Sequence, residues 1–216
     1  MALRAVLWDV DGTLLESRLS IRNTMNTVLA ERGLGTFTRA ELDLQIGRPL
    51  RDILAEKCKD ASVVEAMTHR YREVYNESGW TTAHIFAGLE ELVRKLKGDG
   101  WLQGVVTSKG QRETELLLLD MGLSGVFDVV VGDNDSRPLK PDPAPVRDAC
   151  AQLQVKPGEA VMVGDTRFDV EAGLGAGAHV IGVLWGIQDE PMLRAAGATV
   201  LVDDVDALAE AIERIR

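Results

Sequence analysis

From about Gly88 to the C-terminus, short apolar runs alternate with segments of helical periodicity, and few folds satisfy such a pattern. The apolar runs span 102–106, 127–131, 160–163, 180–184 and 199–202. A helix is expected before each of these runs, at about 88–97, 111–121, 144–153, 169–176 and 189–196, and a last helix closes the chain. Strands that alternate with helices form a parallel sheet that is covered on both faces. The pattern therefore predicts an α/β fold.

The N-terminal part of the chain follows a different pattern. The apolar run 3–7 reads as a buried strand, and Gly12 ends it. Between about 16 and 82 we expect no strand, because apolar residues recur there at helical spacing. Ser20 is a plausible N-cap for the first helix of this block, and Pro49 fits the first turn of a later one. A helical block is thus inserted directly after the first strand.

Length and composition agree with this organisation. A chain of 216 residues fits one domain of ordinary size or a core with a small insertion, and 45% apolar residues are enough for a hydrophobic core. We predict a Rossmann-like parallel-sheet core with helices on both faces, formed by residues 1–15 and 83–216. Residues 16–82 are predicted to form an inserted all-helical cap domain.

Charge, hydropathy and cysteine content exclude several classes of partner. A net charge of -10 argues against a nucleic-acid partner and gives no reason to expect binding to anionic membranes. No apolar run approaches the roughly 20 residues of a membrane span, and the N-terminus lacks the features of a secretory signal. Cys58 and Cys150 have no metal-type spacing and read as small core residues. We expect a cytoplasmic protein, and we make no prediction of its oligomeric state.

Two carboxylates stand at the end of the first strand. Asp9 and Asp11 lie two residues apart, directly before the turn at Gly12. Side chains alternate along a strand, so both lean to the same side if the extended geometry persists. Two like charges held so close need compensation, either by a divalent cation or by a shared proton. The carboxyl ends of strands are where open α/β sheets bind ligands, so a site is favoured over a simple turn.

Further polar groups follow the later strands: Thr107-Ser108-Lys109, Lys140 in a proline-rich loop, and the segment Asp165 to Asp169. In a parallel sheet these strand ends face the same edge, so the groups can converge there. The residue types suit phosphoryl transfer. A carboxylate can attack phosphorus, and Mg²⁺ prefers hard oxygen ligands. A hydroxyl and a lysine can hold the transferring oxygens, while a second carboxyl moves the proton.

These four motifs, in this order and spacing, resemble those of the haloacid dehalogenase superfamily. The helical block resembles the cap of its phosphoglycolate phosphatase-like group, so the resemblance covers nearly the whole chain. It implies a Mg²⁺-dependent phosphatase of small phosphorylated metabolites that works through an aspartyl-phosphate intermediate. Phosphoglycolate is the first candidate substrate.

The resemblance also implies roles for the acidic residues. Asp9 is the nucleophile and a Mg²⁺ ligand. Asp11 is the general acid and base, and it offers its backbone carbonyl to the metal. Asp165 is a metal ligand, and Asp169 supports metal-bound water. An aspartate at the position of Asp11 marks phosphatases and phosphomutases, and the chain departs there from dehalogenases and phosphonatases. Taken alone, Asp165 and Asp169 could instead cap the helix that follows them.

The phosphoryl group is expected to be held by a second set of residues. By resemblance, Thr107 and Lys140 bind it, together with Ser108 and the backbone at Gly12. Taken alone, Thr107 or Ser108 would be typical of a helix cap, and Lys140 of a surface lysine. From the residues themselves we add Arg48 as a contact for the leaving group, because it stands at a helix start after a flexible glycine. The competing interpretation of Arg48 is a solvated arginine.

Two other functions remain open from the sequence. A sugar phosphomutase would share the same core residues, and only the cap distinguishes it. A phospho-receiver signalling domain also surrounds an aspartyl phosphate with acidic residues, a hydroxyl and a lysine. Its phosphorylated aspartate follows a later strand, however, and it lacks a helical insertion of this size.

Overall fold

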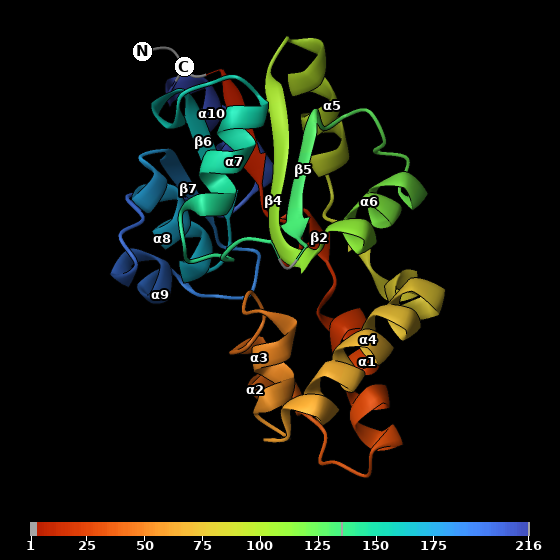
Figure 1. The fold of residues 1–216 in the computed structure, drawn as a ribbon. Coiled ribbons are helices and arrows are strands. Elements are labelled where there is room, and N and C mark those ends of the chain that lie inside the picture. The colour runs from red at the N-terminus through yellow and green to blue at the C-terminus, as the bar shows by residue number, and fades with distance from the viewer. Residues whose placement is uncertain (1–3, 135, 216) are drawn as a thin grey trace.

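The computed structural model describes residues 4–134 and 136–215, and a six-stranded parallel sheet forms its centre (Figure 1). The strand order is β5-β4-β1-β6-β7-β8. The strands are β1 (Ala5–Trp8), β4 (Leu102–Gly110), β5 (Val129–Asp133), β6 (Ala160–Gly164), β7 (His179–Val183) and β8 (Val200–Val202). The predicted α/β class and parallel sheet are confirmed.

Helices cover both faces of the sheet because its strands are apolar on both sides. The helices of the core are α5 (Leu89–Gly98), α6 (Gln111–Asp120), α7 (Ala144–Gln152), α8 (Arg167–Ala176), α9 (Glu190–Ala195) and α10 (Val205–Ile215), with the short 3₁₀ helix η2 (Pro157–Glu159) before β6. Within β1, Val6 and Trp8 join the apolar cluster of α5, α6 and α10. Ala5 and Leu7 join the opposite cluster, with α7, α8 and α9.

The path of the chain makes β1 the point where the winding of the sheet reverses. From β1 the chain continues to β4 and β5 on one side, and then crosses to β6, β7 and β8 on the other. In open α/β sheets a crevice forms at such a point, at the carboxyl ends of the strands. The segment that follows β1 therefore enters this crevice.

The helices between residues 18 and 82 lie at the carboxyl end of the sheet, away from both chain termini (Figure 1). They are α1 (Arg18–Glu31), α2 (Arg39–Asp43), α3 (Leu50–Ala55), α4 (Ala61–Ser78) and the 3₁₀ helix η1 (Gly79–Thr82). We call them the helical segment. Their buried side chains, among them Met25, Leu54 and Met67, form an apolar cluster separate from the two clusters of the sheet.

Between β2 (Leu15–Glu16) and β3 (His84–Ile85) the described residues form no strand, as expected, but one local expectation for this region is wrong. The two short strands pair antiparallel and join the two ends of the helical segment. A strand of two residues is too short to show periodicity, and its partner is distant in the sequence. The first helix begins after Ser17, not after Ser20. Ser20 lies inside the helix, where its hydroxyl forms a hydrogen bond with Thr82 Oγ1 at 2.7 Å.

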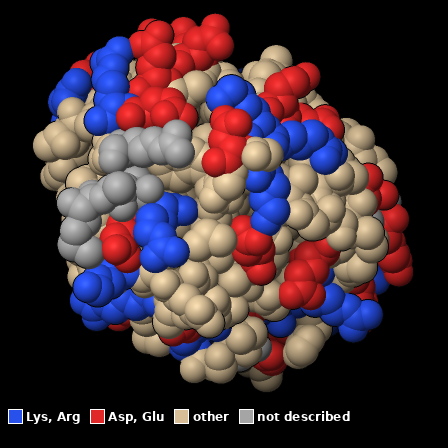
Figure 2. Space-filling view, turned by 90° about the horizontal axis from the view of Figure 1, so that it is seen from above, with Lys and Arg blue, Asp and Glu red and all other residues tan. Residues whose placement is uncertain are grey.

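Charged groups of both signs are interspersed on the face of the molecule seen from above (Figure 2). Exposed ion pairs at helical spacing, such as Arg94 with Glu90 and Lys95 with Asp99, likewise bring opposite charges together on a helix. In this view the excess of acidic residues does not gather into a single-sign surface. Among the described residues, no helix is both long and apolar enough to span a membrane.

A buried hydrogen bond between β1 and β4 provides a test of the core. Trp8 Nε1 donates to Gln103 Oε1 at 3.1 Å, and both side chains are fully buried. We expect Gln103→Met to lower the free energy of unfolding by about 1–3 kcal/mol, because the indole N–H loses its acceptor. Urea denaturation measures the change. In the double variant with Trp8→Phe, the two decreases in the free energy of unfolding should not add, since the orphaned indole N–H is then absent. An unchanged unfolding free energy in Gln103→Met would refute this account.

Candidate active site

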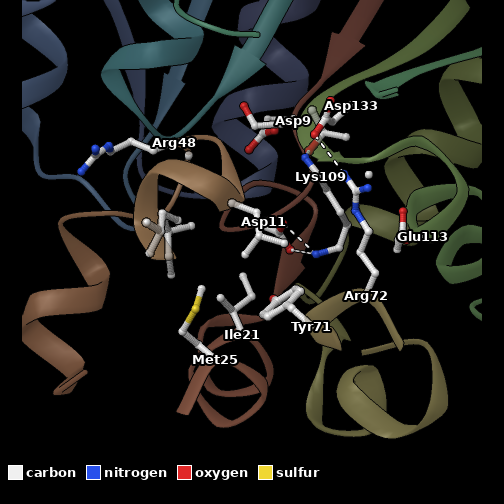
Figure 3. A pocket seen from close by; sticks show the side chains of 17 residues that line it. Asp9, Asp11, Ile21, Met25, Arg48, Tyr71, Arg72, Lys109, Glu113 and Asp133 are labelled. Carbon is white, nitrogen blue, oxygen red and sulfur yellow. Dashed lines mark hydrogen bonds and ion pairs between the residues drawn. The ribbon is translucent and has the colours of Figure 1, made fainter. Parts of the chain in front are cut away.

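A cavity of about 80 Å³ lies at the carboxyl end of the sheet, and among the residues predicted from the sequence Asp9, Asp11, Arg48, Thr107 and Ser108 line it, whereas Gly12, Lys140, Asp165 and Asp169 do not (Figure 3). Its core side is lined by Asp9, Asp11, Thr107 and Ser108, which follow or end strands β1 and β4. Its opposite side is lined by apolar side chains of the helical segment: Ile21, Met25, Ile46, Leu50, Ile53 and Tyr71. The cavity thus lies between the polar strand ends and an apolar wall.

Asp9 lies directly after β1 and is held from two directions. Its backbone N–H donates to the carbonyl of Val163 on β6, at 2.9 Å, which extends the sheet by one residue. Its Oδ1 accepts a hydrogen bond from Lys140 Nζ at 2.7 Å. Lys140 is itself buried, and its ammonium also donates to Val106 O, at 2.8 Å, and to Asp169 Oδ1. One ammonium therefore holds two carboxylates against the backbone of β4.

Asp165 and Asp169 follow β6 and complete a buried acidic cluster. Asp165 Oδ1 accepts from Thr13 Oγ1, and its Oδ2 accepts from the backbone N–H of Ile187, both at 2.8 Å. Asp169 lies in the first turn of α8. Its Oδ2 accepts from the N–H of Thr166 at 3.0 Å and from the Thr166 hydroxyl at 2.6 Å. Asp169 thus caps the helix, as the competing interpretation suggested, and also contacts Lys140.

The electrostatics of this cluster favour a further positive charge. Asp9, Asp165 and Asp169 each offer one carboxylate oxygen within 4.8 Å of the others. Burial raises the pKa of Asp9 to about 7 although Lys140 lowers it, and Asp169 adds to the rise. Burial likewise raises the pKa of Asp165 well above its ordinary value, and Asp9 and Asp169 raise it further. Three carboxylates against one ammonium suit a divalent cation that prefers oxygen ligands.

Two glycines leave room for the carboxylates of Asp165 and Asp169. A Cβ atom on Gly12 would lie 2.3 Å from Asp165 Oδ2, and one on Gly164 would lie 2.2 Å from the Cβ of Asp169. Gly12 also has a φ of +94°, which a side chain would strain. Gly12 is not among the residues that line the cavity. The contact with Asp165 is by itself a sufficient physical reason for glycine at this position.

The Asp11 carboxylate pairs with a residue to which the sequence analysis assigned no role. Lys109 Nζ donates to both oxygens of Asp11, at 3.1 and 2.9 Å, and Ser17 Oγ donates to Oδ1 at 2.6 Å. The Lys109 ammonium also lies 4.3 Å from the centre of the Tyr75 ring. Burial alone would lower the pKa of Lys109, but Asp11 and the nearby Tyr75 and Tyr71 raise it above its ordinary value. The position of Lys109 next to Thr107-Ser108 was the available signal.

The two hydroxyls of this motif have different environments. Thr107 is buried, and its Oγ1 accepts a hydrogen bond from the backbone N–H of Lys109 at 3.2 Å. The Oγ atom of Ser108 is buried without a hydrogen-bond partner among the described residues. Both residues line the cavity. An unsatisfied hydroxyl on the polar side of the cavity is suited to bind a ligand oxygen.

The two arginines near the cavity are both engaged. Arg48 lines the cavity, but its guanidinium points away from it in Figure 3 and contacts Gln45 and Glu56, the latter at 3.3 Å. Arg72, on α4, was not considered from the sequence. It forms an ion pair with Asp133 at the end of β5, at 3.3 Å. The structure therefore brings the acidic residues together with Lys140, whereas Arg48 lies at the margin.

Comparisons with known proteins agree with this geometry. The model of the family described as haloacid dehalogenase-like hydrolase matches residues 6–183. A phosphoglycolate phosphatase of Xanthomonas campestris is 33% identical over 212 residues, which cover 96% of this chain and 95% of that protein. A pyrophosphatase PpaX of Bacillus mycoides is 31% identical over 215 residues, covering 100% and 99% of the two chains.

A solved structure shows the same fold. The crystal structure of a predicted phosphatase from Clostridium acetobutylicum matches with a TM-score of 0.90 at 28% identity, covering 99% of this chain and 100% of the other. The family match extends from β1 to β7 and so includes each strand end that carries a site residue. By the extent of this match, the chain belongs to the haloacid dehalogenase-like hydrolases.

Proposed function

We propose that this hydrolase is a Mg²⁺-dependent phosphatase of small phosphate monoesters, with phosphoglycolate as the first candidate substrate. The observation that carries the proposal is the buried Asp9 carboxylate, which faces the cavity while Lys140 holds its Oδ1. A carboxylate fixed beside a lysine and hydroxyls is suited to attack phosphorus. Relatives named phosphoglycolate phosphatase and pyrophosphatase support phosphoryl chemistry.

The acidic cluster fits the proposed Mg²⁺. Its donors are hard carboxylate oxygens, and one ammonium does not balance three carboxylates. Asp9 and Asp165 would hold the ion, together with the backbone carbonyl of Asp11. Asp169, which is bound by Lys140 and Thr166, would support metal-bound water and not contact the ion directly. When bound, the ion supplies the positive charge that allows a phosphate dianion to approach Asp9.

The proposed reaction has two steps. An Asp9 carboxylate oxygen attacks phosphorus while the bond from phosphorus to the leaving oxygen breaks, and Asp11 gives that oxygen a proton. Asp11 then takes a proton from water, whose oxygen attacks phosphorus as the bond to Asp9 breaks. Inorganic phosphate is released, the Asp9 carboxylate is restored, and Asp11 again carries the proton with which it began. Thr107, Ser108 and Lys140 hold the phosphoryl oxygens during both steps.

The helical segment is proposed to act as the cap, with its domain boundaries at residues 16 and 82. Its side chains form the apolar wall of the cavity opposite Asp9, including Ile21, Met25 and Tyr71. Groups on the core recognise the phosphoryl group, which every phosphate ester shares. Discrimination between esters must therefore come from the wall on the leaving-group side. The same wall keeps bulk water away from the first step.

A panel of phosphate esters with Mg²⁺ tests the proposal directly. The panel contains phosphoglycolate, sugar phosphates, nucleotides, pyrophosphate and aryl phosphates, and release of inorganic phosphate is measured. We expect turnover of at least one ester, and a loss of at least about 10³-fold in Asp9→Asn, which lacks the nucleophile. Transfer to a sugar hydroxyl without release would identify a mutase. A stable phosphorylated protein without turnover would identify a receiver domain. If neither phosphorylation nor turnover is observed, all three functions are rejected.

The metal site can be tested without any substrate. At pH 8 we expect Mg²⁺ to raise the melting temperature of the wild-type protein and to leave that of Asp9→Asn unchanged. Metal-free Asp9→Asn should melt no lower than the metal-free wild type, because one buried negative charge is removed from a crowded cluster. Differential scanning fluorimetry measures both effects. Glu190→Gln, on the exposed side of α9, is the matched control and should keep the full Mg²⁺ shift.

Arg48 remains the proposed contact for the leaving group, and this role requires its guanidinium to leave Gln45 and Glu56. We expect Arg48→Ala to lower kcat/KM at least about 10-fold for the preferred ester of the panel, but little for an aryl phosphate. Steady-state kinetics with the two esters measure the difference. Equal losses would indicate a role in folding or in the core, and the absence of any loss would make Arg48 a surface residue.

A further inference from the structure

Lys109 lies between the two parts of the molecule. It comes from the end of β4, in the sheet, and its side chain is only 8% exposed. On one side its ammonium contacts both carboxylate oxygens of Asp11, at 3.1 and 2.9 Å. On the other side it lies 4.3 Å from the ring centre of Tyr75, which belongs to α4 of the helical segment. Lys109 therefore joins the helical segment to Asp11 through one buried charge.

The surroundings of Lys109 restrict where its ammonium can lie. Tyr75 is buried, and its ring stacks on that of Tyr71 at 5.7 Å with an interplanar angle of 16°. Figure 3 shows the Lys109 side chain reaching down to the Asp11 carboxylate, with the Tyr71 ring drawn below them. A cation over an aromatic face away from water is attracted by the negative face of the ring. The packing of α4 on the core thus fixes the ammonium, and the ammonium fixes the Asp11 carboxylate together with Ser17.

We propose that Lys109 is a positioning residue that couples the packing of α4, through Tyr75, to the orientation of the Asp11 carboxylate. The inference rests on the proposed function, in which Asp11 protonates the leaving oxygen. Through this link the helical segment would orient Asp11 in addition to enclosing the substrate. The acid group is held in place when α4 covers the site, and it loses one of its two anchors when α4 moves away.

The chemistry of the leaving group separates this role from a general structural one. An ester with a poor leaving group needs a well-placed acid, whereas a good leaving group departs with little help from a proton. Phenyl phosphate and 4-nitrophenyl phosphate have nearly the same shape but differ in the acidity of the phenol released. Misplacement of Asp11 should therefore slow phenyl phosphate more than 4-nitrophenyl phosphate. A general loss of structure should slow both equally.

The experiment compares kcat/KM for these two esters, with Mg²⁺, in wild type and variants. We expect Lys109→Met to lower kcat/KM for phenyl phosphate about 10–100-fold and for 4-nitrophenyl phosphate at most about 3-fold. Tyr75→Leu should change the ratio of kcat/KM for the two esters in the same direction. The double variant should lose no more kcat/KM for phenyl phosphate than Lys109→Met alone. Tyr75→Phe, which keeps the ring, and Lys109→Arg, which keeps the charge, should stay close to wild type. Lys97→Met, which removes a lysine paired with Asp128, is the matched control.

The outcomes test the positioning role of Lys109 and its coupling to α4 separately. An equal loss on both esters in Lys109→Met would overturn the positioning role. If Tyr75→Leu keeps the wild-type ratio of kcat/KM for the two esters, the coupling to α4 is overturned. Tyr75→Leu also tests the proposal if Lys109→Met does not fold. If the wild type hydrolyses other esters of the panel but neither aryl ester, two of those with different leaving-group acidity replace the pair. If it hydrolyses none, the proposed function fails.

Discussion

The rest of the structure depends on how three carboxylates are kept buried beside one ammonium. Burying a charge costs several kcal/mol unless hydrogen bonds and opposite charges compensate for it. Lys140 contacts Asp9 and Asp169, while Thr13 and the N–H of Ile187 bind Asp165. These donors come from distant parts of the chain and meet only if the sheet is correctly assembled. The acidic cluster therefore requires the fold around it to be rigid.

The topology of the sheet explains why these donors meet. Because β1 is where the winding reverses, its carboxyl end faces segments from both halves of the sheet. Asp9 continues β1 through its backbone hydrogen bond to Val163, Thr107 lies in β4 next to the paired residue Val106, and Asp165 directly follows β6. Groups that perform chemistry need small positional error, and strand ends provide it. The proposed catalytic side chains thus belong to the rigid part of the molecule.

The helical segment meets the sheet through contacts of another kind. Besides the short pair β2 and β3, it is joined to the core by the ion pair of Arg72 with Asp133 and by the approach of Lys109 to Tyr75. A close contact also occurs at Gly47, where a Cβ would lie 2.8 Å from the Phe168 ring. None of these contacts belongs to the strand ladder of the six-stranded sheet. In the proposed function, this division would place selectivity on the helical segment and bond-breaking on the core.

The sequence by itself determined the parallel sheet, the helical segment and the set of residues at the strand ends, because periodicity and motif order are local properties of the chain. It could not show that Lys109 holds Asp11, that Arg48 contacts Glu56, or that Leu15 and Glu16 pair with β3. Each of these depends on which side chains meet when segments far apart in the sequence pack together. Local patterns carry no information on such partners, so only the tertiary structure decided them.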